Sequence, residues 1–237
     1  MDKGIRKAQE LVLKAFAKEA KGFALAGGTA LELFYLNHRF SADLDFFSPK
    51  YDTKEIEGLL KAFKKACGKK ISLESEFIAP TKAKVRFYAM PVTGSSRALK
   101  IDFVEDVQFD KPAIRKVKGV RIYSAANLYL QKISAISGIG SGMDSIGRRV
   151  SAGRGQARDV FDVYMLSKKI EPLHAFLKNA PSQYQRGMIH WHRTFSRQGL
   201  KLSLLDLDIY DTNFDSRQMI EYFDDEIKQF MKEVVEQ

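Results

Sequence analysis

Three aspartates on two short apolar segments are the residues of this sequence best suited to chemistry. Asp43 and Asp45 belong to Asp43-Leu-Asp-Phe-Phe47, and Asp102 belongs to Lys100-Ile-Asp-Phe-Val104. Side chains alternate between the faces of a strand, so Asp43 and Asp45 are expected to face one way while their apolar neighbours face the core. If the two strands are neighbours, the three carboxylates converge, and divalent cations are the usual means of offsetting such a repulsion.

A glycine-rich turn, Gly27-Gly28-Thr29, follows an apolar run of strand length and precedes these aspartates. The glycines allow close approach of the backbone, and Thr29 is expected to be the N-cap of a helix that extends to Tyr35. The N–H groups at the start of a helix favour a phosphate. Magnesium held by carboxylates beside such a turn is typical of phosphoryl or nucleotidyl transfer. Each pattern alone is common, and the ordered combination is much more specific.

Four segments of the chain resemble motifs of one known family. AGGTALELFYLNHRFSADLDFF, residues 26–47, resembles the first motif of the nucleotidyltransferase AbiEii/AbiGii toxin family, within the polymerase-β-like nucleotidyltransferase superfamily. Residues 100–104 resemble the strand that carries the third carboxylate. Leu128-Tyr-Leu-Gln-Lys132 and Ala157-Arg-Asp-Val-Phe-Asp162 resemble the family's helical pair, one helix ending in lysine and one with the pattern RDxxDL. The resemblance spans roughly residues 22–167 and implies the fold of that superfamily.

The resemblance implies a role for each matched residue. Asp43 and Asp45 would hold a pair of Mg²⁺ ions, and Asp102 would complete the metal site and help to deprotonate the attacking hydroxyl. The glycine-rich turn would contact the nucleoside triphosphate, and Lys132 would neutralise its charge. The residues that the resemblance assigns to nucleotide binding are Gly27, Gly28, Thr29, Lys132, Arg158, Asp159 and Asp162.

Without the resemblance, the charged residues of the helical pair favour a plainer interpretation. Arg158 and Asp162 are four residues apart, a spacing that predicts an exposed ion pair on a helix, and Lys132 would be an ordinary surface lysine. A second Asp-Leu-Asp sequence at 206–208 is preceded by no glycine pair at a suitable distance, and we expect a loop or short strand there.

The order of the expected elements divides the chain into two halves. Residues 1–123 are expected to form an α+β nucleotidyltransferase core with a small mixed sheet. Residues 124–237 are expected to form a helical domain that contains a Gly/Arg-rich loop at 138–155. Strands are expected at 22–26, 43–47, 71–78, 84–92, 98–104 and 117–123, and helices at 4–20, 29–35, 53–66, 125–137, 157–169, 172–178, 182–197 and 216–235.

The composition limits the kinds of partner and the cellular compartment that we expect for this protein. Lys and Arg number 39 against 29 Asp and Glu, a net charge of +10, and this surplus favours a polyanionic partner such as RNA. Cys67 is the single cysteine, which excludes an internal disulfide framework. The sequence has no apolar run of membrane-spanning length and no signal-peptide pattern at its start. A cytoplasmic protein without a membrane partner is therefore expected.

The sequence as a whole predicts a Mg²⁺-dependent nucleotidyltransferase that moves a nucleoside monophosphate from an NTP to a hydroxyl acceptor. The positive charge favours RNA, in particular tRNA, as the acceptor. By resemblance, the protein would be the toxin of a toxin–antitoxin or phage-defence pair, with a cognate antitoxin as its partner. Two alternatives remain open, which are transfer to a small molecule or protein side chain, and a non-catalytic nucleotide- or RNA-binding module.

Overall fold

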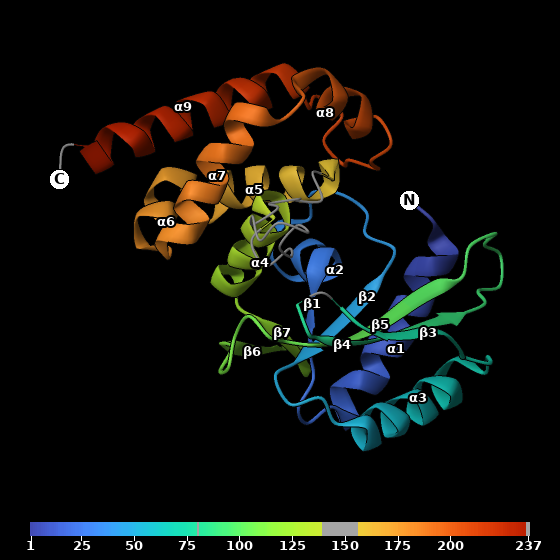
Figure 1. Cartoon of the computed structure of the whole chain (residues 1–237). Coiled ribbons are helices and arrows are strands. Elements are labelled where there is room, and N and C mark those ends of the chain that lie inside the picture. The colour runs from blue at the N-terminus through green and yellow to red at the C-terminus, as the bar shows by residue number, and fades with distance from the viewer. Residues whose placement is uncertain (80, 139–155, 236–237) are drawn as a thin grey trace. The chain divides into compact units, whose positions relative to one another are not determined.

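The computed structural model describes residues 1–79, 81–138 and 156–235 (Figure 1). Most of the Gly/Arg-rich loop expected at 138–155 lies outside these residues. The chain divides into two compact units. The first is Met1–Tyr35 with Phe40–Asn127, and the second is Leu36–Arg39 with Leu128–Gln237. The expected division into folding domains at residue 123 remains a prediction.

The first unit is built on a mixed β-sheet, which has seven strands in the described part of the chain. The strand order is β3-β4-β5-β2-β1-β7-β6. At its centre, β2 pairs with β5 in parallel and with β1 in antiparallel orientation. The strands are β1 (Ala24–Ala26), β2 (Leu44–Ser48), β3 (Ser72–Ile78), β4 (Lys84–Met90), β5 (Leu99–Glu105), β6 (Ile114–Val117) and β7 (Val120–Tyr123).

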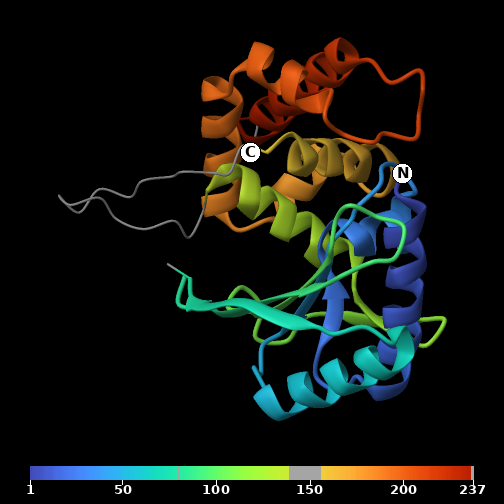
Figure 2. The ribbon, with the colours of Figure 1, turned by 90° about the vertical axis from the view of Figure 1, so that its right-hand side faces the viewer.

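Two amphipathic helices, α1 (Lys3–Glu19) and α3 (Thr53–Cys67), cover one face of this sheet (Figure 2). The Phe16 ring of α1 stacks on Phe46 of β2 at a centroid distance of 4.2 Å, and Phe63 of α3 lies 5.9 Å from the same ring. Phe46 and Phe103, on neighbouring strands, are fully buried in this layer. Because strand side chains alternate, the residues beside these phenylalanines must face the other side of the sheet.

Local sequence explains where α1 and α3 begin and end. The Asp2 carboxylate accepts the N–H groups of Gly4 and Ile5, and the Asp52 carboxylate caps α3 in the same way. Gly68 ends α3 in the left-handed conformation, with φ of +63°, where glycine avoids the steric cost of a side chain.

The helix after β1 differs from the expected one. It begins at Gly27 rather than at Thr29 as α2 (Gly27–Leu31) and continues as the π-helical segment η1 (Glu32–Leu36). Its N-cap is Ala26, which makes no side-chain cap hydrogen bond. The prediction of Thr29 as N-cap is therefore wrong, because Thr29 is the third residue of the helix and its hydroxyl donates to backbone carbonyls outside it.

The single strand expected at 117–123 is also wrong. Two strands, β6 and β7, pair as a hairpin around Lys118 and Gly119. Both turn residues have positive φ, +49° and +84°, as a type I′ hairpin turn requires. The valines that flank the turn made the segment resemble one continuous strand.

The second unit is helical in its described residues. Its core includes Phe223, whose ring contacts Tyr164 and Trp191. The helix expected at 182–197 ends at Thr194, and a separate helix that the sequence analysis missed begins at Arg197. None of the helices in the described ranges is long and apolar enough to cross a bilayer. The helices from residue 125 onward are α4 (Ala125–Ser137), α5 (Ala157–Lys169), α6 (Leu173–Asn179), α7 (Ser182–Thr194), α8 (Arg197–Leu204) and α9 (Ser216–Val235).

Candidate active site

Asp45 and Asp102 lie side by side on the two central parallel strands of the first unit. The register of β2 and β5 makes them direct partners. Their apolar neighbours on both strands are fully buried beneath α1 and α3, so both carboxylates share the opposite face of the sheet. Neighbouring strands are about 4.8 Å apart, which brings the two carboxylates to the same small area. The expected pairing of the two strands is confirmed.

Gly27 closes this area from the β1 side. Ala26, the last residue of β1, is the register partner of Asp45, and Gly27 follows with φ of +66°. A Cβ atom on Gly27 would lie 2.0 Å from Oδ2 of Asp45. The backbone of the turn therefore lies directly against the carboxylate, and a glycine is needed for both reasons.

Thr29 connects the turn to the segment that carries Asp43. Thr29 is fully buried, and its hydroxyl donates to the backbone carbonyl of Asp43 and, at 3.3 Å, to that of Ser41. Asp43 lies one residue ahead of β2 and is half-buried. The side chain of Thr29 thus holds the backbone at the entrance to the Asp-Leu-Asp sequence.

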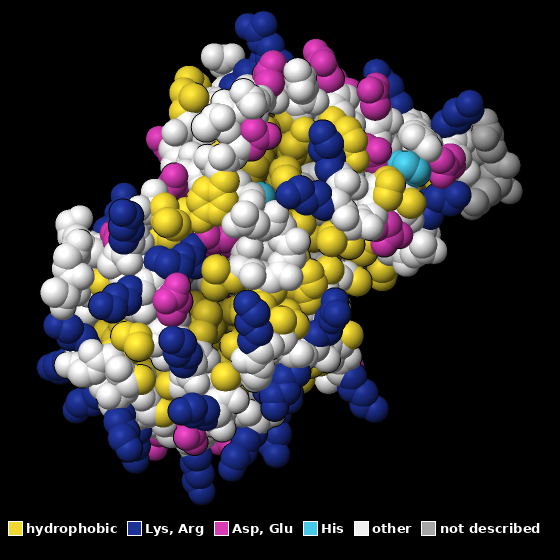
Figure 3. Space-filling model, turned by 180° about the vertical axis from the view of Figure 1, so that it is seen from behind, with side chains coloured by type: hydrophobic (Ala, Val, Ile, Leu, Met, Phe, Trp, Pro, Cys, Tyr) yellow, Lys and Arg dark blue, Asp and Glu magenta, His cyan; other side chains and the backbone are white. Residues whose placement is uncertain are grey.

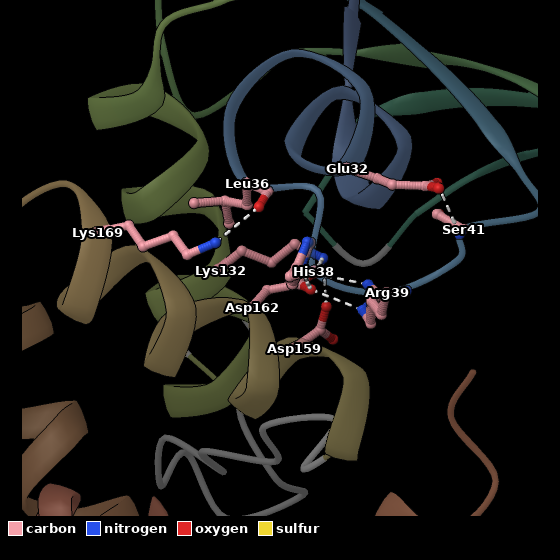
Figure 4. Close-up of polar contacts among 9 residues, drawn as sticks. All are labelled: Glu32, Leu36, His38, Arg39, Ser41, Lys132, Asp159, Asp162 and Lys169. Carbon is pink, nitrogen blue, oxygen red and sulfur yellow. Dashed lines mark hydrogen bonds and ion pairs between the residues drawn. The ribbon is translucent and has the colours of Figure 1, made fainter. Parts of the chain in front are cut away.

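Glu32 and its partners were missed by the sequence analysis. The Glu32 carboxylate is almost fully buried and accepts the N–H of Ser41 at 2.9 Å (Figure 4). It also pairs with the guanidinium of Arg6. The side-chain amide of Gln9 donates to the carbonyl of Ser41 at 2.9 Å. These bonds fix the connection that leads into β2. The signal in the sequence was one acidic residue within the apolar run Ala30-Leu-Glu-Leu-Phe34.

The chemistry of the donor set fits a hard divalent cation. Asp45 and Asp102 present carboxylate oxygens on one face, and carboxylate oxygen is the ligand type that Mg²⁺ takes. Among residues 1–79, 81–138 and 156–235, no three His, Cys, Asp or Glu side chains are gathered into a metal-binding group. Of the three carboxylates that were expected to converge, Asp45 and Asp102 are thus the two that the strand register places side by side.

In the second unit, Asp162 is the centre of a buried ionic cluster (Figure 4). Arg39 pairs with it through two contacts, Nε to Oδ1 at 2.7 Å and a terminal nitrogen to Oδ2 at 2.8 Å. His38 Nε2 lies 2.8 Å from Oδ1, and Lys132 Nζ lies 2.8 Å from Oδ2. The Asp162 side chain is fully buried, so the exposed ion pair with Arg158 expected from spacing is wrong.

Lys132 is not the surface lysine that its position alone suggested. Its ammonium lies 2.6 Å from Oδ1 of Asp159 as well as 2.8 Å from Asp162. Burial by itself would lower the pKa of Lys132, but the two carboxylates outweigh it and raise that pKa. Burial likewise tends to raise the pKa of Asp162, and the charges of Lys132 and Arg39 hold it well below its usual value.

The cluster gives residues 36–39 a role that the sequence did not suggest. The segment falls between the helix expected at 29–35 and the strand expected at 43–47, yet it supplies two of the partners of Asp162. Lys169 Nζ donates to the carbonyl of Leu36 at 3.0 Å, and the N–H of Tyr210 donates to the carbonyl of His38 at 3.0 Å. Leu36–Arg39 is therefore integrated into the second unit, although its neighbours on both sides belong to the first.

The residues predicted for the site thus fall into two groups. Within the first unit, the structure brings Asp45 together with Asp102 and Gly27, and Thr29 with the backbone of Asp43. Gly28 is buried in the first turn of α2. Within the second unit, Lys132 contacts Asp159 and Asp162, and Arg158 is exposed on α5. The catalytic, metal-binding and nucleotide-binding roles assigned to them remain predictions.

Comparison with known proteins identifies the chain's relatives. The family model described as nucleotidyl transferase AbiEii toxin, type IV TA system, matches residues 11–237. No curated protein matches the sequence. A crystal structure of a candidate nucleotidyltransferase from H. pylori has a TM-score of 0.60 and 20% identity, and the match covers 98% of this chain and 95% of that one. The crystal structure of JHP933 from Helicobacter pylori has a TM-score of 0.56 and 20% identity, with 98% and 92% covered. The expected α+β nucleotidyltransferase fold, with a mixed sheet followed by a helical half, is confirmed.

Proposed function

The chain belongs to the nucleotidyl transferase AbiEii toxin family of type IV toxin–antitoxin systems, and from this premise we propose that it transfers a nucleoside monophosphate from an NTP to a hydroxyl of RNA. The observation that carries the proposal is the register of Asp45 with Asp102, directly against the glycine turn. A cognate antitoxin is the expected protein partner. Because NTPs and RNA are cytoplasmic, we propose that the enzyme acts there.

The aspartates and glycines of the candidate site in the first unit each have a defined role in this proposal. Asp45 and Asp102, with Asp43, would hold Mg²⁺, which when bound polarises phosphoryl oxygens and offsets the charge of the triphosphate. The carboxylate of Asp102 accepts the proton of the attacking hydroxyl. The oxygen then forms a bond to the α-phosphorus, and the bond to pyrophosphate breaks. Gly27 and Gly28 keep this edge free of side chains, so that phosphates can approach the backbone.

The charge distribution supports RNA as the acceptor. The first unit has 23 Lys and Arg against 15 Asp and Glu, a net +8, whereas the second has 16 against 14. Figure 3 shows Lys and Arg side chains spread over the face of the first unit that is turned to the viewer. The positive surplus thus lies on the unit that carries Asp45 and Asp102, and such a field attracts a polyanion.

The test is transfer of labelled α-phosphate from each NTP to total RNA, with and without Mg²⁺. Asp45→Asn and Asp102→Asn are expected to lower the rate at least a hundredfold, because each removes a negative ligand. Asp206→Asn is the matched control, since Asp206 belongs to the second Asp-Leu-Asp sequence and is exposed on a turn after α8. It is expected to keep full activity. Undiminished transfer by Asp45→Asn would overturn the proposal.

Two further outcomes separate the open alternatives. If the label appeared on protein or on a small molecule, and its transfer depended on Asp45, the chain would still be a nucleotidyltransferase but its acceptor would not be RNA. Calorimetric binding of NTP and Mg²⁺ without transfer to any acceptor would favour a non-catalytic binding module. Toxicity on expression that Asp45→Asn abolishes would link the chemistry to the role implied by the family.

A further inference from the structure

An aromatic side chain lies next to the carboxylate pair on the side away from the glycine turn. The register of β4 and β5 makes Phe87 the direct partner of Asp102. Residues opposite one another on paired strands share a face, so Phe87 lies on the same face as Asp102 and Asp45. Ala26, Asp45, Asp102 and Phe87 therefore form one row across β1, β2, β5 and β4, and the glycine turn follows Ala26 at one end of the row.

A second ring extends this surface. Phe77 of β3 lies 5.3 Å from Phe87 between ring centroids, with an interplanar angle of 75°. Phe77 is 43% exposed, and Phe87 is half-buried. Two adjoining aromatic rings, one of them this exposed, offer a surface on which a planar group can stack.

A lysine on the same face, together with the net charge of the unit, favours a nucleic acid as the ligand of the rings. Lys100 lies two residues before Asp102 on β5, hence on the same face, and it is exposed. The unit as a whole carries the net positive charge described above. Aromatic rings beside cationic side chains are the combination on which proteins stack and hold unpaired nucleotides.

We propose that Phe87 and Phe77 form the subsite on which the terminal base of the RNA acceptor stacks. This inference rests on the proposed function. The base is joined to the ribose whose hydroxyl reacts, so it must settle within a few ångströms of Asp102, and Phe87 is one strand spacing, about 4.8 Å, away. The glycine turn, proposed to receive the triphosphate, lies on the opposite side of Asp45. The two substrates therefore approach the carboxylates from opposite sides.

The test compares substrate constants in the full-length enzyme. Phe87→Leu and Phe77→Leu are each expected to raise KM for an RNA acceptor about tenfold, because stacking is lost while an apolar side chain remains. The KM for NTP should stay unchanged, and kcat should stay within about threefold. Phe87→Tyr keeps the ring and should behave as the wild type. In an Asp45→Asn background, which removes turnover, Phe87→Leu should weaken RNA binding by a similar factor in fluorescence anisotropy.

Ile78→Ala provides the matched control. Ile78 neighbours Phe77 on the same strand, is 69% exposed, and faces the other side of the sheet. If it raised the acceptor KM as much as Phe77→Leu, the effect would belong to strand stability and the inference would fail. A rise in KM for NTP alone would assign the rings to the nucleotide base instead. If the wild type transferred the nucleotide to protein but never to RNA, both the proposed acceptor and this subsite would be overturned. If transfer to RNA were the same in both Phe→Leu variants as in the wild type, only the subsite would be overturned.

Discussion

Gly27 and Asp45 occupy adjoining space so tightly that a Cβ atom on Gly27 would lie 2.0 Å from a carboxylate oxygen of Asp45. Gly27→Ala is therefore expected to displace that carboxylate and to strain a backbone with φ of +66°. We expect transfer to fall about a hundredfold, the effect of a displacement of about 1 Å in a catalytic group. The measurement is kcat, together with the melting temperature from circular dichroism.

Gly58→Ala is the control for this change. Gly58 lies exposed within α3, and its added methyl would meet nothing within 4 Å. An alanine there should stabilise the protein by about 0.5–1 kcal/mol and leave kcat unchanged. Full activity in Gly27→Ala would show that the contact with Asp45 has no part in catalysis.

Thr29→Val tests whether the threonine positions Asp43. The valine keeps the shape but leaves the backbone carbonyls of Asp43 and Ser41 without the hydroxyl donor. We expect a loss of about 1–3 kcal/mol in the free energy of unfolding and a lower kcat. Thr29→Ser, which retains the hydroxyl, should restore most of both. A raised KM for NTP with unchanged kcat would instead support the direct nucleotide contact that the family resemblance implies.

The carboxylate pair could be predicted because its signal is local. An aspartate between two apolar residues fixes which face of a strand it occupies, and that alternation holds for both Asp45 and Asp102. The pairing of the two strands required the family resemblance, since nothing local to either segment specifies its neighbour. The row that continues to Phe87 depends on a third strand and could not be predicted at all.

The buried cluster escaped prediction for the opposite reason. Arg39 and Asp162 are 123 residues apart, and each alone has the composition of an exposed charge. Spacing along one helix suggested Arg158 as the partner of Asp162, because local reasoning can pair only residues that are close in sequence. The same limit hid the role of Glu32, whose partners are Arg6 on α1 and Ser41 in the connection before β2.

Asp162→Asn is expected to destabilise the second unit by about 3–5 kcal/mol, because the buried charges of Arg39 and Lys132 would each lose a carboxylate with which they pair. Urea unfolding followed by the fluorescence of Trp191, the single tryptophan, reports on this unit. Asp224→Asn is the control, since Asp224 pairs with His192 and Arg197 where the carboxylate is 28% exposed. Its loss should cost less than about 1 kcal/mol. Equal effects of the two changes would contradict the burial of the Asp162 cluster.

Acid should remove the contribution of Asp162 to the free energy of unfolding within a definite range of pH. The pKa of Asp162 in the folded chain is well below 3.8 despite the opposing effect of burial, whereas an unfolded aspartate titrates near about 3.9. The unfolded state therefore takes up its proton first as the pH falls, so the stabilisation is complete above about pH 5 and declines below about pH 4. The urea midpoint of the wild type should approach that of Asp162→Asn as the pH is lowered from 6 to 3, and a constant difference between the two midpoints would show that the carboxylate is not held in its charged form.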